Sequence, residues 1–144
     1  MRATAGLNVK AAGAAPAAAL TANAVGQVRG GVSLLLRLEG GAELAAAILA
    51  YAMLGGGWVM FVVLLLVPDL SMLGYLAGNR AGAVVYNAAH TYLAPALLAG
   101  LAWALHLPPW VTLVALIWAA HIGADRLLGF GLKYPEGFKP THLG

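Results

Sequence analysis

The sequence predicts an all-α fold, a four-helix transmembrane bundle whose helices run up, down, up and down through a bilayer. The first observation is composition: of 144 residues, 62% are hydrophobic and only 9% are charged, and the mean hydropathy is +0.85. A soluble domain carries about a quarter charged residues, so this chain has too little polar surface to face water on all sides. The second observation is four apolar runs, each close to the roughly 20 residues that a helix needs to cross the hydrocarbon core.

Residues that form turns separate the four runs. Their bounds are about 32–54, 58–76, 81–105 and 110–130. Three glycines end the first run, Pro68 introduces a kink in the second, and Leu-Pro-Pro at 107–109 separates the third from the fourth. The runs lack the period-two alternation of strands and are heavy in Ala and Leu. Together they form one transmembrane domain, 32–130.

The eight Lys and Arg residues predict the orientation of this bundle. They lie before or at the start of the first run, between the second and third runs, and at or beyond the end of the fourth. The other two turns contain neither Lys nor Arg. By the positive-inside rule, both termini and the middle turn are cytoplasmic, in a multi-pass protein of the cytoplasmic membrane. The net charge of +3 is scattered beside apolar segments without interleaved aromatics, so no nucleic-acid partner is expected.

The two ends of the chain differ from the runs in composition. Residues 1–31 are rich in Ala and Gly and lack the large aliphatics that would anchor them in lipid, which predicts a flexible tail. The last segment, 131–144, holds glycines, prolines and aromatics that cannot continue a helix. We expect it to fold back under the bundle as a cytoplasmic lid that presents Lys133, Tyr134 and His142 to a site. A plain flexible terminus is the alternative.

Ionisable residues gather on one side of the predicted bundle. Four of the five acidic residues lie inside or at the end of an apolar run, where a central carboxylate costs about 3 kcal/mol. The alternating topology brings together the start of the first run, the end of the second, the start of the third and the end of the fourth. These places carry, in order, Glu39 with Glu43, Asp69, His90, and His121 with Asp125. The spacing of four within each pair puts both members on one helix face.

This convergence predicts a metal centre near the cytoplasmic leaflet. Imidazole nitrogens and carboxylate oxygens from facing helices are the donors of zinc, manganese and iron sites. The chain has no cysteine, which excludes thiolate ligands and thiol nucleophiles. The expected ligands are His90, His121, Asp125, Asp69 and Glu39. Behind them, as hydrogen-bonding or proton-carrying groups, we expect Glu43, Tyr86, Asn87, Tyr134 and His142.

Each of these residues also has a purely structural interpretation. His121 and Asp125 can pair with each other, or with nearby arginines, in a buried network that fixes helix register. Glu39 can pair with a cation at the interface, and Asp69 can cap the turn that follows it. The structural interpretation would need a separate reason for each ionisable residue on this side of the bundle, whereas the turns on the other side contain His106 as their single ionisable residue. The metal hypothesis explains this one-sided distribution with a single cause.

Four segments resemble a known family. They are RLEGGAEL, PDLSMLGYLAG, YNAAHTYLAP and ALIWAAHIGADRLLGFGLKYPEGFKPTHLG. Over about 35–144 the chain closely resembles small bacterial membrane proteins classed as domain of unknown function family 4260. The resemblance implies a bacterial inner-membrane location and marks these positions: Glu39, Asp69, Tyr86, Asn87, His90, His121, Asp125, Arg126, Lys133, Tyr134 and His142. It leads us to expect Tyr at Phe130, a departure that argues against a catalytic phenol there.

The family name carries no activity, so the functional hypothesis rests on the site. The Pro-Asp after an apolar run, followed by histidines, is loosely similar to membrane-bound metal-dependent hydrolases. We expect a metal-dependent hydrolase or transferase that acts on a lipid or other amphiphile from the cytoplasmic leaflet. His90, His121 and Asp125 would hold the ion. In the remaining catalytic roles, Asp69 or Glu39 would bridge a second ion or act as general base, and Lys133 or Arg126 would stabilise developing negative charge.

Two other functions remain open from the sequence. The same carboxylates and histidines suit a proton- or cation-coupled transporter or channel subunit. They equally suit a structural or accessory membrane subunit in which the polar cluster only fixes the geometry of the bundle. Small residues along the runs permit close helix contacts within one chain or between copies in a homo-oligomer.

Overall fold

Five α-helices and one 3-10 helix make up most of the computed structural model, which describes residues 27–139 and 141–143. In chain order they are α2 (Gly31–Met53), α3 (Trp58–Leu65), η1 (Pro68–Ala77), α4 (Asn79–Ala89), α5 (Leu93–Ala104) and α6 (Pro109–Leu128). The described residues contain no strand, only an isolated antiparallel bridge between Lys133 and Thr141. The prediction of an all-α fold is confirmed. The predicted tail lies almost wholly in residues 1–26, outside the described residues.

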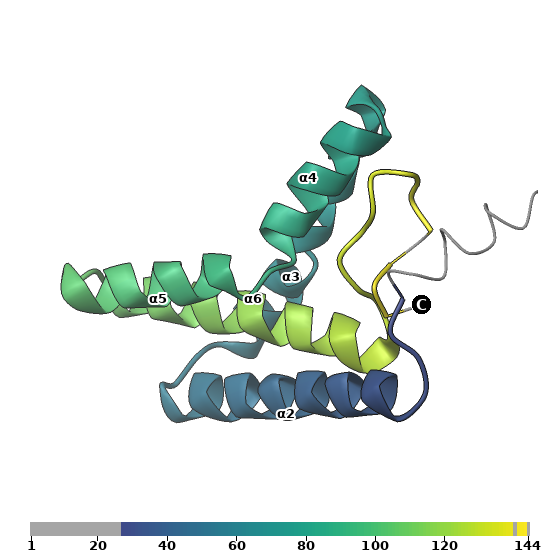
Figure 1. Ribbon diagram of the computed structural model, residues 1–144. Helices are drawn as coiled ribbons and strands as arrows, with labels where there is room; N and C mark the ends of the chain where they lie inside the picture. Colours follow the sequence, from purple (N-terminus) through teal and green to yellow (C-terminus); the bar gives the residue numbers. More distant parts are fainter. Residues whose placement is uncertain (1–26, 140, 144) are drawn as a thin grey trace, which may run out of the picture.

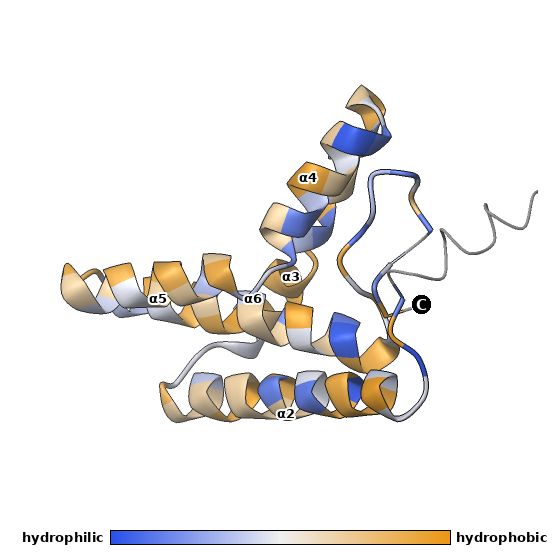
Figure 2. Ribbon diagram, viewed as in Figure 1, coloured by the Kyte–Doolittle hydropathy of each residue, from blue (hydrophilic) through white to orange (hydrophobic). Residues whose placement is uncertain are grey.

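The helices form a layer and an arm. Helices α2, α5 and α6 lie side by side, with α6 between the other two, whereas α4 packs on η1 and stands away from this layer (Figure 1). The C-terminal segment follows α6 and returns beside α4. Figure 2 shows hydrophilic residues where the lower part of α4, the end of α6 and the C-terminal segment meet, while α5 is almost entirely apolar. The arm and the layer therefore meet at the polar part of the molecule.

Glycines allow α2 and α6 to approach closely. A methyl group added at Gly123 of α6 would come within 2.8 Å of the carbonyl oxygen of Gly40 in α2. Gly40 itself has no room for a side chain because the Cβ of Arg126 occupies that space. Small residues let two helix backbones come together and gain dispersion contacts. This contact fixes the position of α6, which carries part of the polar cluster.

The apolar core lies toward the other end of the same helix pair. Tyr51 is fully buried and packs with Phe61 and Ile117. Its hydroxyl donates to the carbonyl oxygen of Gly57 at 2.7 Å, so burial leaves the phenol paired. The ring of Tyr51 meets those of Phe61 and Trp58 with centroids 5.1 and 5.8 Å apart. These aromatic contacts attach α3 to α2 and α6.

The second apolar run changes helix type at the expected proline. Helix α3 ends at Leu65, and the 3-10 helix η1 begins at Pro68, which agrees with the predicted kink. Proline suits the first position of a helix because the N–H it lacks would have no partner there. Runs of 3-10 helix longer than three or four residues are uncommon, and this one extends over ten. It places Asp69 in its first turn, at the base of the arm.

The third predicted helix is divided into two, so the expectation of one helix over 81–105 is wrong. Helix α4 ends at Ala89 and α5 begins at Leu93, and the two leave the junction in different directions (Figure 1). Pro95, in the first turn of α5, accounts for the break, because its ring would clash with the carbonyl of Thr91 in a continuous helix. The structure thus has five α-helices where a bundle of four is expected.

Large apolar side chains remain exposed along most helices. Two stretches, Trp58–Ala77 and Pro109–Leu128, are long and apolar enough to cross a membrane, by length and composition. Few residues of the first stretch are fully buried, whereas the second is partly covered by its neighbours. Exposed apolar surface of this extent marks contact with lipid or with protein partners.

Candidate metal centre

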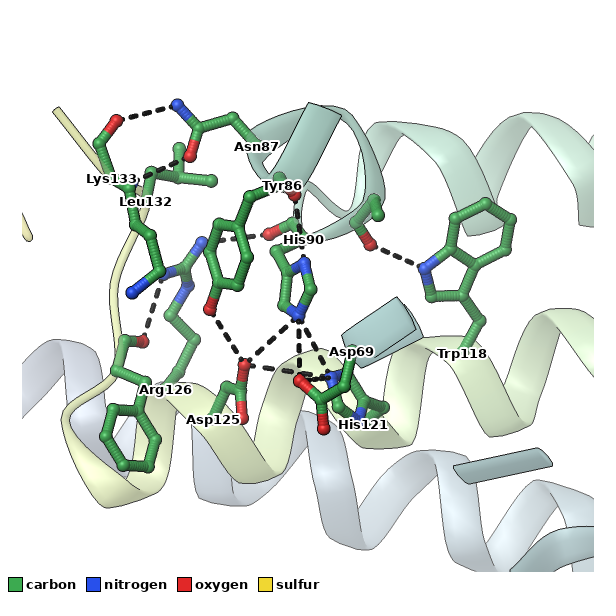
Figure 3. Close-up of polar contacts among 12 residues, drawn as sticks. Asp69, Tyr86, Asn87, His90, Trp118, His121, Asp125, Arg126, Leu132 and Lys133 are labelled. Carbon is green, nitrogen blue, oxygen red and sulfur yellow. Dashed lines mark hydrogen bonds and ion pairs between the residues drawn. The ribbon is translucent and has the colours of Figure 1, made fainter. Parts of the chain in front are cut away.

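Four ionisable side chains from three helices meet where α4 reaches α6. Asp69 comes from η1, His90 directly follows α4, and His121 and Asp125 lie one turn apart on α6 (Figure 3). One donor atom of each lies within 4.8 Å of the others. Both histidines are buried, whereas 17% of the Asp125 side chain and 38% of the Asp69 side chain are exposed. The structure therefore brings together four of the five predicted ligands.

The distances between these donors match those of a metal site. The Nε2 atoms of the two histidines are 3.1 Å apart. Each Nε2 lies 3.5 to 3.7 Å from Oδ1 of Asp69 and from Oδ2 of Asp125. A tetrahedral centre with bonds of about 2.0–2.2 Å separates its donors by roughly 3.3–3.6 Å. The four atoms are close enough together that they could hold one divalent ion, and the same distances also allow ion pairs if an imidazole is protonated.

The backbone fixes which nitrogen of His90 faces the cluster. Its Nδ1 lies 2.9 Å from the carbonyl oxygen of Tyr86. A carbonyl oxygen only accepts, so Nδ1 carries the proton and, in the neutral ring, Nε2 presents its lone pair to the other three donors. Metal-binding histidines commonly donate their second nitrogen to a backbone carbonyl in this way.

Tyr86 contacts two members of the cluster. Its ring stacks on the imidazole of His90, with centroids 3.7 Å apart and planes 10° from parallel. Its hydroxyl donates to Oδ2 of Asp125 at 3.3 Å, the same oxygen that faces the histidines. Tyr86 is buried and lies one turn before His90 on α4. Tyr86 therefore orients both the imidazole of His90 and the carboxylate of Asp125.

Side chains of α6 satisfy the broken end of α4. The indole nitrogen of Trp118 donates to the carbonyl oxygen of Ala89 at 2.6 Å, and Nη2 of Arg126 donates to that of His90 at 3.0 Å. Carbonyls at a helix end have no partner within the helix, so these two bonds stabilise the break. Both donors come from the same stretch of α6 as His121 and Asp125 (Figure 3). One helix thus supplies two possible ligands and holds a third in place.

A family model for a domain of unknown function (DUF4260) matches residues 33–144, which include the whole cluster. The chain belongs to this family. Comparisons with curated proteins and with solved structures find no match. Membership confirms the resemblance seen in the sequence, and the chemistry of this DUF4260 chain has to be argued from its own residues.

The C-terminal segment is held against α4 by Asn87. The side-chain amide of Asn87 donates to the carbonyl oxygen of Lys133 at 2.9 Å, and its oxygen accepts from the N–H of Lys133 at 2.7 Å. The amide of Asn87 thus bonds to both backbone groups of Lys133, as a residue of a neighbouring β-strand would. Residues 131–139 and 141–143 therefore return beside α4 in this DUF4260 chain, with the half-buried Tyr134 among them.

The ammonium of Lys133 lies next to the cluster without joining it. Nζ donates to the carbonyl oxygen of Phe138 at 2.8 Å and lies 4.7 Å from the centre of the Tyr86 ring. Burial lowers the pKa of Lys133, whereas the negative charge of Asp125 acts in the opposite direction. Arg126 is likewise engaged with backbone, since its two hydrogen bonds go to the carbonyls of His90 and Phe130. Both cations are close to the site, and both are held by carbonyl oxygens.

Three other predicted residues lie around a separate cavity. Glu39 and Glu43 are exposed on α2 and, with His142 and Arg126, line a space of about 440 Å³ between α2 and the end of α6. Glu39, the fifth predicted ligand, is therefore not part of the four-residue cluster. Nδ1 of His142 accepts from the N–H of Leu132 at 2.9 Å, which ties the two arms of the C-terminal segment together.

Trp118 is the residue of the site that sequence reasoning misses. An interfacial belt position is the ordinary expectation for a tryptophan in a membrane helix. Trp118 lies three residues before His121 and seven before Asp125, which puts all three on one face of α6. This spacing is the feature of the sequence that could have assigned Trp118 to the site. Its partner, the carbonyl oxygen of Ala89, exists only because α4 stops there. Without the break, the role of Trp118 cannot be inferred.

Proposed function

We propose that this chain is a multi-pass protein of the bacterial inner membrane with a catalytic divalent metal centre of zinc, manganese or iron. Its reaction would be hydrolysis or group transfer on a lipid or other amphiphile. The observation that carries this proposal is the donor set: two buried imidazoles and a carboxylate at metal-ligand spacing, with the more exposed Asp69 on the remaining side. Two histidines and one carboxylate are the ligands of several catalytic zinc sites.

The unequal exposure of the two carboxylates supports a catalytic rather than a closed site. Structural metal sites surround the ion with protein ligands, whereas catalytic sites keep one position for water or substrate. Here His90, His121 and Asp125 come from the packed α4–α6 junction, while Asp69 lies on the accessible side with 38% of its side chain exposed. Asp69 is therefore the member that can move aside or act on an incoming molecule.

Each residue of the site has a defined task in this proposal. A divalent ion lowers the pKa of a water molecule and polarises the bond to be broken. The carboxylate of Asp69 accepts the proton of the attacking water as general base. The hydroxyl of Tyr86 keeps Asp125 oriented through its hydrogen bond, and the ammonium of Lys133, above the Tyr86 ring, supplies positive charge on that side.

The membrane location is supported by exposed apolar surface and by the distribution of cations. Trp58–Ala77 combines the length of a membrane helix with many exposed apolar side chains, which are unfavourable in water. Lys and Arg are absent from the turns at 54–57 and 105–108. The positive-inside rule then places the opposite side, with both termini and the metal centre, in the cytoplasm.

A structural role is the second candidate, because the four side chains also satisfy one another. Each imidazole lies within 3.7 Å of both carboxylates, so one protonated histidine would pair with both carboxylates, while the two Nε2 atoms, 3.1 Å apart, share a hydrogen bond when only one of them carries a proton. Such a network would fix the junction of arm and layer without any metal. A relay across the membrane has less support, because the turns on the other side offer His106 alone as an acid or base.

Metal analysis separates these candidates. Full-length protein, purified without chelator and resupplied with zinc, manganese or iron, should contain close to one ion per chain by elemental analysis. Asp125→Asn and His121→Ala should each lose most of it, because affinity depends on ligand number and charge. His106→Ala, in an exposed turn, should retain it. Wild-type protein that stays metal-free after resupply, with the variants losing only thermal stability, would establish the structural role instead.

A further inference from the structure

An apolar cavity lies directly beside the candidate metal centre. It has a volume of about 310 Å³ and lies between the junction of α3 with η1 and the middle of α6. Three of its lining residues are close in sequence to candidate ligands: Pro68 precedes Asp69, Ala89 precedes His90, and Trp118 lies one turn before His121. The cavity and the cluster are therefore formed by the same three segments.

One polar atom in the wall of this cavity has no partner. The hydroxyl of Ser71 is buried and makes no hydrogen bond among the described residues. A buried hydroxyl without a partner loses the hydrogen bonds it makes to water, which costs free energy. In a 3-10 helix, residues three apart lie above one another, so Ser71 follows Pro68 along the same wall. Rotation of the Ser71 side chain about its Cα–Cβ bond would turn the hydroxyl toward the cavity, where a ligand oxygen would provide the missing partner.

The cavity reaches the apolar outer surface of the molecule. Val67, one of its walls, is 47% exposed, and its neighbours Leu66 and Leu70 are more exposed still. A molecule entering past Val67 would come from the hydrocarbon side of a membrane rather than from water. Its far end would lie at Ala89 and Trp118, whose mutual hydrogen bond leaves mainly carbon atoms to face the cavity.

We propose that this cavity binds the single hydrocarbon chain of an amphiphile whose ester or phosphoester oxygen accepts a hydrogen bond from Ser71. This inference rests on the proposed function, since it specifies the substrate of the metal centre. An apolar cavity of roughly 150 Å³ already holds benzene, so about twice that volume accommodates part of one alkyl chain but not two. The chain in the cavity places the adjoining polar group beside Asp69.

Quenching of Trp118 fluorescence tests this proposal without a known substrate. The other three tryptophans are exposed, and Trp58→Phe, Trp103→Phe and Trp110→Phe leave Trp118 alone. In nanodiscs of unbrominated phosphatidylcholine, a brominated dodecyl ester should quench Trp118 saturably at low mole fraction. A brominated two-chain phospholipid should quench only weakly and without saturation. Metal content is measured on the same samples.

Two variants and a matched control decide the outcome. Val114→Phe places a ring in the cavity and should abolish saturable quenching. Ser71→Ala keeps the shape and should weaken binding about three- to ten-fold. Val62→Phe, on the exposed face of α3, should bind the probe like the parent protein.

Saturation unchanged in Val114→Phe, or absent in the parent protein, would overturn the cavity proposal even if metal is bound. Saturable binding to protein that stays metal-free after resupply would overturn the metal centre and keep the alkyl site.

Discussion

At the scale of single residues, Tyr86 shows how the cluster is organised. Its ring is stacked on one histidine, and its hydroxyl is bonded to one carboxylate, so a single buried side chain touches donors that come from two helices. The stacking and the hydrogen bond can be separated by removing only the oxygen.

We predict that Tyr86→Phe lowers metal affinity about 10- to 100-fold while the fold is kept, the range found when residues that support ligands are changed. Asp125 would still be present but free to rotate away from the histidines. A competition titration against a calibrated chelator measures the affinity. Tyr75→Phe is the matched control, because the Tyr75 hydroxyl is also buried but has no hydrogen-bond partner among the described residues. Equal affinities of both variants would show that the Tyr86 hydroxyl does not support the site.

The sequence allows the convergence of four of the five candidate ligands to be predicted, because topology and spacing act together. His121 and Asp125 share a face at a spacing of four, and alternating helices bring Asp69 and His90 to the same side. The same reasoning includes Glu39, which the structure places on the exposed surface of α2. Helical spacing groups residues on one face, but which face of α2 turns toward α6 depends on the close contact of Gly40 with Gly123, and that contact cannot be recognised from the positions of polar residues.

At the scale of elements, the C-terminal segment is held by polar contacts that respond to pH. Burial and the positive charge of Arg126 lower the pKa of His142 below its ordinary value of 6.5. The neutral imidazole accepts from the N–H of Leu132, a bond that protonation removes. Because the pKa is lower in the folded segment, its stabilisation is complete above about pH 6.5 and declines as the pH falls toward the folded value.

We therefore predict that acidification from pH 7.5 to 5.5 loosens the segment. The chain has no cysteine, so a spin label on Lys139→Cys, at an exposed position, reports its mobility. The spectrum should sharpen on acidification in the parent protein and stay constant in His142→Gln. The other ionisable groups around this histidine are Glu39, Glu43, Tyr92 and Arg126. Equal sharpening in His142→Gln would assign the transition to one of those groups.

The helices themselves were predictable in type and only partly in extent. The apolar runs identify α2 and α6 closely, and Pro68 marks the start of η1. The division of the third run follows from Pro95, whose effect on the preceding turn is visible in the sequence. The new direction of α5 is not visible there, because it depends on the bonds that Trp118 and Arg126 make to the end of α4. Those bonds join residues 29 and 36 positions apart.

At the scale of the whole molecule, the proposed orientation makes a direct prediction. Reporter fusions after Gly144 and within the turn at 105–108 should report opposite sides of the membrane, with the C-terminal fusion in the cytoplasm. Moving positive charge into that turn, with Leu107→Arg, should weaken this preference. A periplasmic C terminus would place the metal centre and its Lys133 on the wrong side for the proposed substrate.

The contact between α2 and α6 has a consequence for biosynthesis. The earliest described helix packs chiefly on the latest, so α2 leaves the ribosome long before its glycine face can be covered. The four side chains of the cluster emerge in the order Asp69, His90, His121 and Asp125, so Asp69 and His90 can contact only each other until the final quarter of the chain is made. We therefore expect the glycine face of α2 to stay open to contact with other helices during synthesis, until α6 has left the ribosome and packs on it.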